Sequence, residues 1–140
     1  MNATDLKQML DAYKAAVYAK DVAAFMALYD EEVRVFDMWG KWSYDGAQAW
    51  RGMVADWFGS LGTGRVVVAF DDVQINMTED LGVAQAFVTY KGVSAGGEEL
   101  RAMQNRLTCV FRQKGGVWKI IHEHSSTPVD FETAKAVLRR

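Results

Sequence analysis

The chain has 140 residues with a formal net charge of -2, and half of its residues are hydrophobic. This length predicts a single domain, residues 1–140, and the hydrophobic content excludes a disordered chain. The charge gives no electrostatic reason to bind nucleic acid or an anionic membrane, because both require clustered lysine and arginine. No apolar run approaches the roughly 18 residues of a membrane span, and the first residues lack a signal-peptide pattern. A soluble cytoplasmic protein is therefore expected.

The first third of the chain predicts two helices. Residues 4–19 carry apolar side chains at intervals of three and four, with Thr4 as a suitable N-cap. Residues 20–32 continue with a second apolar pattern, and Asp21 is placed to cap it. Both segments therefore predict amphipathic helices.

A short strand and a third helix are predicted next. Residues 32–39 alternate between apolar and polar side chains, which is typical of a strand. Residues 40–46 predict a loop, and residues 47–62 predict a helix that ends at Gly59 or Gly62.

The second half of the chain is rich in strand-forming residues. Four strands are predicted, at residues 65–80, 81–94, 98–116 and 117–126. The turns between them are short, which indicates an antiparallel meander. The tail predicts a short helix after Pro128, with Asp130 as its cap.

Helices followed by an antiparallel sheet predict the α+β class. Three helices on one face of a strongly curved sheet would form a cone with an internal pocket. Four tryptophans, Trp39, Trp42, Trp50 and Trp57, precede the sheet closely in sequence. Trp39 and Trp57 are our candidates for the pocket wall, and the alternative is that these rings pack the third helix onto the sheet.

Three stretches carry a resemblance to a known superfamily: "AKDVAAFMALYDEEVRVFD", "YDG" and "RLTCVFRQKGGVWKIIHEHSSTP". Together with the order of elements, they resemble the cone-shaped fold of nuclear transport factor 2, ketosteroid isomerase and the SnoaL-like polyketide cyclases. The last stretch is also similar to the association domain of calcium/calmodulin-dependent protein kinases. The resemblance implies either a small isomerase or cyclase acting on a hydrophobic carbonyl compound, or a non-catalytic binding or oligomerisation module.

The resemblance also implies two catalytic residues. Asp37 matches the catalytic aspartate of the isomerases, and Tyr13 matches the tyrosine that stabilises their oxyanion. From the residues themselves, Asp37 shares a strand face with Val33 and Val35, and burial there would raise its pKa and make it a better base. Tyr13 could equally be a helix tyrosine that only packs.

Arg106 stands close to the position at which the isomerases carry a protonated acid. The matching residues here are Leu107 or Thr108, so that acid is missing. Arg106 could neutralise an anionic ligand in the pocket, or it could form a cross-strand ion pair with Glu123.

His122 and His124 are the only histidines, two residues apart on a predicted strand. Two ligands fall short of the three or four that zinc requires, so we expect no metal. We expect His122 to have a structural or interface role.

The inward face of the last strand is ambiguous. Trp118 and Ile120 favour the histidine face, whereas the resemblance to ketosteroid isomerase favours the face of Glu123 and Ser125. We name both His124 and Glu123 as candidate pocket residues.

The outer face of the sheet predicts a homodimer, because strands rich in Val, Ile, Phe and Tyr leave both faces partly apolar. Cys109 is the only cysteine, which excludes an intramolecular disulfide, and we expect a buried residue without function. No motif for a nucleotide, flavin or nicotinamide is present, so no cofactor is expected.

Overall fold

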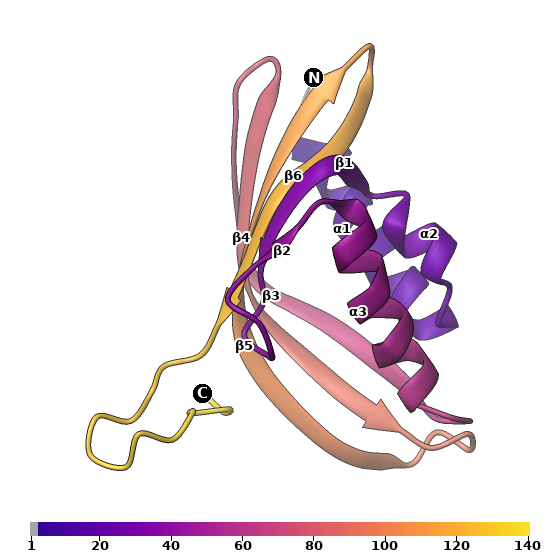
Figure 1. The fold of residues 1–140 in the computed structure, drawn as a ribbon, viewed down its shortest axis with the longest axis vertical. Coiled ribbons are helices and arrows are strands. Elements are labelled where there is room, and N and C mark those ends of the chain that lie inside the picture. Colours follow the sequence, from indigo (N-terminus) through magenta and orange to yellow (C-terminus); the bar gives the residue numbers. More distant parts are fainter. Residues whose placement is uncertain (1–2) are drawn as a thin grey trace.

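The computed structural model describes residues 3–140 and contains three helices and one six-stranded, strongly curved sheet (Figure 1). The helices are α1 (Ala3–Ala19), α2 (Val22–Met26) and α3 (Ala47–Ser60). The strands are β1 (Tyr29–Phe36), β2 (Tyr44–Asp45), β3 (Arg65–Met77), β4 (Leu81–Val93), β5 (Glu99–Lys114) and β6 (Val117–Ser126). The helices cover the concave side of the sheet. The predicted α+β class and cone shape are confirmed.

The strand order in the sheet is β2-β1-β6-β5-β4-β3. Strands β3 to β6 form the predicted antiparallel meander. The sheet as a whole is mixed, because β1 pairs parallel with β6, with Phe36 opposite His124. This pairing corrects the prediction of a purely antiparallel sheet. It also brings the end of β1 beside the end of β6.

The second helix is shorter than predicted. Asp21 caps α2 as expected, but the helix has five residues instead of spanning 20–32. The backbone N–H of Ile120 donates to the carbonyl of Leu28 (2.8 Å), and Tyr29 then pairs with Ile120 as the first residue of β1. Pairing with β6 therefore outweighs the local helix propensity of this segment.

One irregularity decides which side chains of β6 face the helices. Val110 of β5 lies opposite His122, but the next residue, Phe111, lies opposite Ile120. Ile121 is therefore the extra residue of a β-bulge, and the alternation of faces along β6 shifts there by one position.

Glu123 and Ser125 are buried on the inner face, as is Ile120 on the other side of the bulge. His124 is exposed on the outer face, where its ring meets that of Phe36 (centroids 5.5 Å apart). Each of the two interpretations of the last strand is therefore correct on one side of the bulge: Ile120 faces inward before it, and Glu123 and Ser125 face inward after it. Trp118 also packs against the core, yet the histidines do not share its face.

The predicted C-terminal helix is wrong. Residues 127–140 leave the sheet on its convex side and return to it (Figure 1). The carboxylate of Asp130 accepts the N–H groups of Glu132 and Thr133, but these residues form a turn and not a helix. An isolated antiparallel bridge between Val129 and Ala136 joins the two ends of this turn. The N–H of Gln104 donates to the carbonyl of Leu138 (2.7 Å), so the chain end extends the edge of β5 beyond the end of β6.

The core fills the space between the helices and the concave face. Its fully buried side chains include Phe25, Val33, Val35 and Phe111. Within residues 3–140, no helix combines the length and apolar character needed to cross a membrane.

Candidate functional site

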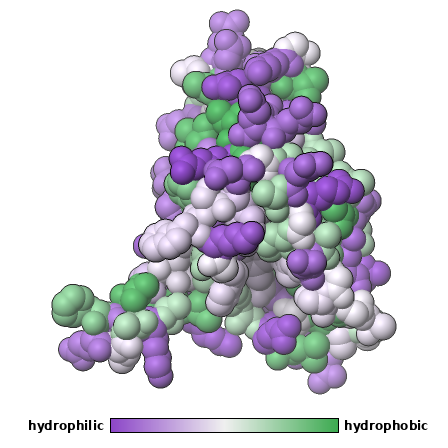
Figure 2. Space-filling model, in the orientation of Figure 1, coloured by the Kyte–Doolittle hydropathy of each residue, from purple (hydrophilic) through white to green (hydrophobic). Residues whose placement is uncertain are grey.

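A cavity of about 500 Å³ lies between the inner face of the sheet and helices α1 and α3. Figure 2 shows a hollow in the lower half of the visible face, between the sheet and α3. Five aromatic side chains line the cavity: Tyr13, Trp39, Trp50, Trp57 and Tyr90. Trp50 and Trp57 are seven residues apart, two helical turns, and so share one face of α3. Five aromatic rings thus contribute to the cavity walls beside aliphatic and polar side chains, with Trp39 at 55% exposure on the rim.

Glu123 is the most deeply buried acid at the cavity, with 2% of its surface exposed. The hydroxyl of Tyr29 donates to its Oε1 (2.6 Å), and the thiol of Cys109 also contacts that oxygen (3.8 Å). Burial raises the pKa of Glu123 to about 7, although the hydrogen bond from Tyr29 lowers it in part. Glu123 therefore exchanges protons near neutral pH.

Asp37 follows β1 and lies on the inner side with Val33 and Val35, as the alternation predicts. Its Oδ1 accepts the hydroxyl of Ser125 (3.1 Å), and its Oδ2 accepts the backbone N–H of Trp39 (3.3 Å). Partial burial raises the pKa of Asp37, and these hydrogen bonds offset part of the increase. Asp37 is thus a positioned carboxyl group at the cavity with strengthened basicity.

The hydroxyl oxygens of Tyr13 and Tyr90 lie 3.0 Å apart at the cavity wall. Two hydroxyls have two hydrogens, and the bond between them uses one, so the other can point to a ligand. Burial raises the pKa of both tyrosines, which keeps them protonated as donors. The pair can therefore stabilise negative charge on a ligand oxygen.

Five of the predicted site residues line this cavity: Tyr13, Asp37, Trp39, Trp57 and Glu123. Arg106 and His124 do not, and their placement in the pocket is corrected. Both line a second hollow on the outer face of the sheet. Arg106 alternates with the inward Leu107, and its Nε donates to Ser126 (3.2 Å). Because Glu123 faces inward, the alternative ion pair with Arg106 is also wrong.

The sequence interpretation missed four polar residues of the cavity: Ser60, Tyr90, Arg101 and Asn105. Ser125 also lines it, on the strand face that the resemblance to ketosteroid isomerase implied. The Oδ1 atom of Asn105 is buried and has no hydrogen-bond partner within residues 3–140. A signal for two of them was present, since Arg101 and Asn105 have the same strand parity as the apolar residues Leu107, Cys109 and Phe111 of β5.

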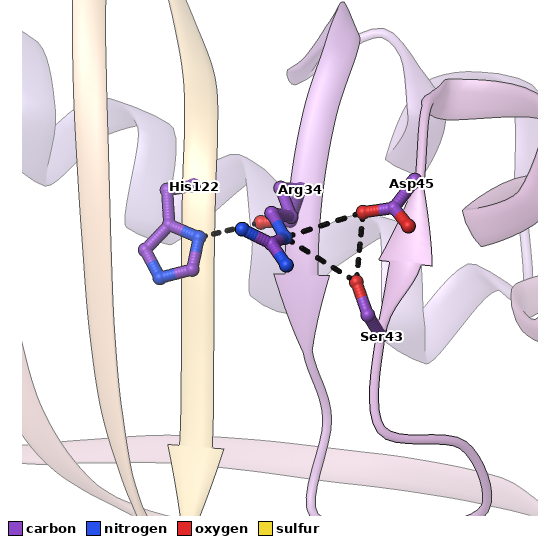
Figure 3. A network of polar contacts seen from close by, with 4 residues as sticks. All are labelled: Arg34, Ser43, Asp45 and His122. Carbon is purple, nitrogen blue, oxygen red and sulfur yellow. Dashed lines mark hydrogen bonds and ion pairs between the residues drawn. The ribbon is translucent and has the colours of Figure 1, made fainter.

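His122 has a structural role on the outer face. Its Nδ1–H donates to the backbone carbonyl of Arg34 (2.7 Å), which ties β6 to β1 (Figure 3). The guanidinium of Arg34 reaches Asp45 (3.3 Å) and Ser43 (3.5 Å), which holds β2 against β1. The described part of the chain, residues 3–140, contains no group of three or more His, Cys, Asp or Glu suited to a metal ion.

Replacing Cys109 by alanine is expected to leave ligand binding and any turnover unchanged. Burial and the neighbouring Glu123 raise the pKa of the thiol, so Cys109 stays protonated and is a poor nucleophile. Calorimetric titration of Cys109→Ala and wild type with a ligand found by screening checks this. A large loss of affinity or of turnover in a variant that remains folded would contradict it.

One protein-family model matches the chain: a SnoaL-like domain, over residues 6–130. Among solved structures, an NTF2-like protein of unknown function from Pseudomonas putida is 26% identical, with 96% of this chain and 92% of that chain covered and a TM-score of 0.84. A candidate calcium/calmodulin-dependent protein kinase II association domain from Xanthomonas campestris is 17% identical (90% and 87% covered, TM-score 0.76). An NTF2-like superfamily protein from Salmonella enterica is 15% identical (96% and 96% covered, TM-score 0.72). No match is found among curated proteins.

Proposed function

The chain belongs to the SnoaL-like domain family, and from this premise we propose that it is an enzyme of the isomerase or cyclase type. Its substrate is a small hydrophobic carbonyl compound, from which it abstracts a proton at the carbon next to the carbonyl group. One observation carries the proposal: two carboxyl groups, of Asp37 and Glu123, and two phenol hydroxyls, of Tyr13 and Tyr90, line one aromatic cavity.

Asp37 is the base. Its carboxylate takes the proton, and the electron pair of the broken C–H bond forms a carbon–carbon double bond as the carbonyl oxygen becomes an enolate. Desolvation makes a carboxylate a stronger base than it is in water, and the raised pKa of Asp37 has this cause. Ser125 and the N–H of Trp39 hold the carboxyl group in one orientation.

The paired hydroxyls of Tyr13 and Tyr90 stabilise the enolate oxygen. A hydrogen bond to a developing oxyanion is strong in an apolar site, and a pre-positioned donor needs no reorganisation. The pair thereby takes the place of the acid that the ketosteroid isomerase pattern requires and that this sequence lacks. It also takes the role that the sequence had suggested for Arg106.

Glu123 is the second proton carrier. With a pKa of about 7 it is protonated in a large fraction of molecules at neutral pH. Where a C=C bond is conjugated with the enolate, Glu123 can give its proton to the far carbon of that bond, and the double bond moves into conjugation with the re-formed carbonyl group. That step gives an isomerised product. If instead the enolate carbon attacks a second carbonyl carbon of the same molecule, the electron pair of that C=O π bond moves to its oxygen, which takes the proton of Glu123, and the product is cyclic. The enzyme is reset when Asp37 releases the abstracted proton to solvent and Glu123 takes one up.

The cavity supports a hydrophobic ligand of moderate size. Its volume of about 500 Å³ is within the range typical of small-molecule sites, roughly 300–1,000 Å³. Aromatic walls favour a flat, apolar molecule, whose carbonyl group would be its main polar feature.

The alternative function is a non-catalytic binding or oligomerisation module, since one fold can host unrelated functions. Thermal-shift screening of enolisable ketones, followed by deuterium exchange of each hit in D₂O, separates the two. Exchange into the ligand above the buffer background supports the enzyme. Binding without exchange across the whole set supports the binding module and contradicts the enzyme.

A further inference from the structure

The polar groups on the cavity wall differ in how far the protein itself satisfies them. The hydroxyl of Ser60 donates to the carbonyl of Trp57 (2.6 Å). Ser125 donates to Asp37 and accepts the backbone N–H of Met38 (both 3.1 Å). These two hydroxyls already have partners within the chain, so they do not require a ligand to satisfy them.

Asn105 is the exception among these groups. It lines the cavity and is only 7% exposed. Its Nδ2 donates to the sulfur of Met38 (3.5 Å), which is a weak acceptor. Its Oδ1 has no hydrogen-bond partner within residues 3–140. An amide oxygen can accept two hydrogen bonds, so Asn105 places an acceptor at the wall to which the described protein supplies no donor.

An acceptor in this position favours a ligand that carries a donor. A ligand that fills the cavity excludes water from the wall, so the oxygen of Asn105 then depends on the ligand for a hydrogen bond. If the ligand lacks a donor, the oxygen stays buried and unpaired, which costs more than a typical hydrogen bond gains. Sites of this kind discriminate against analogues that lack the donor.

Asn105 lies between the two parts of the proposed reaction centre. The inward residues of β5 on either side of it are Met103 and Leu107. Met103 lies opposite Tyr90 of the hydroxyl pair, and Leu107 lies opposite Ser125, which is hydrogen-bonded to the base. Successive inward residues of a strand are about 7 Å apart. A ligand whose carbonyl group lies at the tyrosine pair would therefore reach Asn105 with a substituent about one ring away.

We propose that the ligand of this cavity is a hydroxyketone, whose hydroxyl group donates a hydrogen bond to Oδ1 of Asn105. The inference rests on the proposed function, because it takes the carbonyl group of the ligand to lie at the tyrosine pair. Asn105 is then a specificity-determining residue, which selects the ligand without taking part in the proton transfers. The substrate class narrows from hydrophobic carbonyl compounds to those with a hydroxyl on the same ring system.

The donor that suits this position is neutral. A cationic donor would have to lose its hydration opposite an uncharged amide, which is costly. It would also favour the ionised form of the nearby Asp37 and so weaken that group as a base. A hydroxyl supplies one hydrogen without either penalty.

Calorimetric titration of wild type with indanone, its hydroxyl isomers and the matching methoxy isomers tests the donor. At least one hydroxyl isomer is expected to bind about tenfold more tightly than indanone, because it supplies the hydrogen that Asn105 accepts. The methoxy isomers have the same oxygen but no donor, so they should show no such gain. The proposal is overturned if no hydroxyl isomer binds more tightly than indanone, including no binding at all. It is also overturned if the methoxy isomers gain equally.

The substitution Asn105→Leu locates the effect. Leucine is similar in size and removes the acceptor, so the variant should bind indanone at least as tightly as wild type and should lose the preference for the hydroxyl isomer. Thr108→Val is the matched control, because it removes a polar group from the outer face of the same strand and should keep the preference. Circular dichroism checks that both variants fold. A preference that persists in folded Asn105→Leu would contradict the assignment, and the wild-type comparison decides if that variant does not fold.

The same ketones separate this inference from the proposed function, because indanone and its isomers have an enolisable C–H bond. Deuterium exchange into them reports on the base, whereas the hydroxyl preference reports on Asn105. Exchange without a hydroxyl preference would support the enzyme and overturn the contact with Asn105. A hydroxyl preference without exchange would support the contact and contradict the enzyme.

Discussion

Asp37→Asn is expected to abolish deuterium exchange at the α-carbon of a bound ketone while the ketone still binds. The substitution removes the base but keeps its shape. The asparagine can accept the N–H of Trp39 through Oδ1 and donate from Nδ2 to Ser125, so the local hydrogen bonds persist. Loss of a general base typically costs about 10² to 10⁴ in rate. Exchange measured by NMR in D₂O, beside calorimetric titration of the same ketone, checks both parts.

Asp45→Asn provides the matched control. Asp45 is an exposed acid on the neighbouring strand, and its carboxylate contacts Arg34 and Ser43 in the edge network of Figure 3. Its substitution should leave exchange unchanged. Equal exchange by wild type and Asp37→Asn would rule out Asp37 as the base. A variant that no longer binds the ketone would show that Asp37 binds the ligand instead.

The sequence could predict the positions of Asp37 and Tyr13, because the periodic pattern of buried side chains is unbroken in the strand and in the helix that carry them. Val33, Val35 and Asp37 follow one another at intervals of two, and the strand keeps that period, so Asp37 does reach the inner face. The position of Tyr13 follows from helical periodicity in the same way, because it shares the buried stripe of α1 with Leu6 and Leu10.

The bulge at Ile121 could not be predicted from the sequence. Alternation through "WKIIHEH" places Trp118, Ile120 and both histidines on one face, and nothing in the composition marks the extra residue. The bulge appears only in the pairing of β6 with β5, since two adjacent residues of β5 lie opposite residues two apart on β6. Because of this one extra residue, Glu123 faces the cavity and His124 faces the opposite side of the sheet.

The misplacement of Arg106 had a different origin. Its strand pairs with β4 without a register shift from Arg101 to Arg112. The apolar residues Leu107, Cys109 and Phe111 occupy alternate positions, which indicates that Arg106 points away from them. The family pattern fixes the place of Arg106 along the strand but not the face of the sheet to which its side chain points. The helix α2 is short because the residues after it pair with β6, and the tail is not helical because it pairs with β5. Both partners are far away in the sequence, so the helix propensity of the local residues cannot predict these pairings.

Glu123→Gln is expected to make the folded protein more stable at alkaline pH. The pKa of Glu123 is about 7 in the folded chain against a usual value of 4.5, so the folded state binds the proton more tightly than the unfolded state does. Between these two pH values the folded state holds more protons, and the free energy of unfolding therefore falls as pH rises. Below about pH 4.5 both states are protonated at this position and the penalty is absent.

The expected size of this effect follows from the same two values. A difference of about 2.5 pH units, at about 1.4 kcal/mol per unit, makes ionised Glu123 cost about 3 kcal/mol above pH 7. Glutamine carries no charge and still accepts the hydroxyl of Tyr29, so the variant avoids this cost while keeping the contact. The variant and wild type should therefore be similarly stable near pH 4.5 and should differ by about 3 kcal/mol near pH 8.

Urea unfolding of wild type and Glu123→Gln from pH 4.5 to 8.5 measures this difference directly. Groups that do not interact with Glu123 cancel in the comparison, so the pH-dependent difference reports Glu123 together with its coupling to Asp37. Glu79→Gln, at an exposed acid, is the control for the substitution itself and should change the free energy of unfolding by no more than about 0.5 kcal/mol. A difference that is constant across the pH range would mean that Glu123 ionises as an ordinary glutamate. Its place as a neutral-pH proton carrier in the cavity would then be lost, whereas the assignment of Asp37 as the base would still stand on its own exchange experiment.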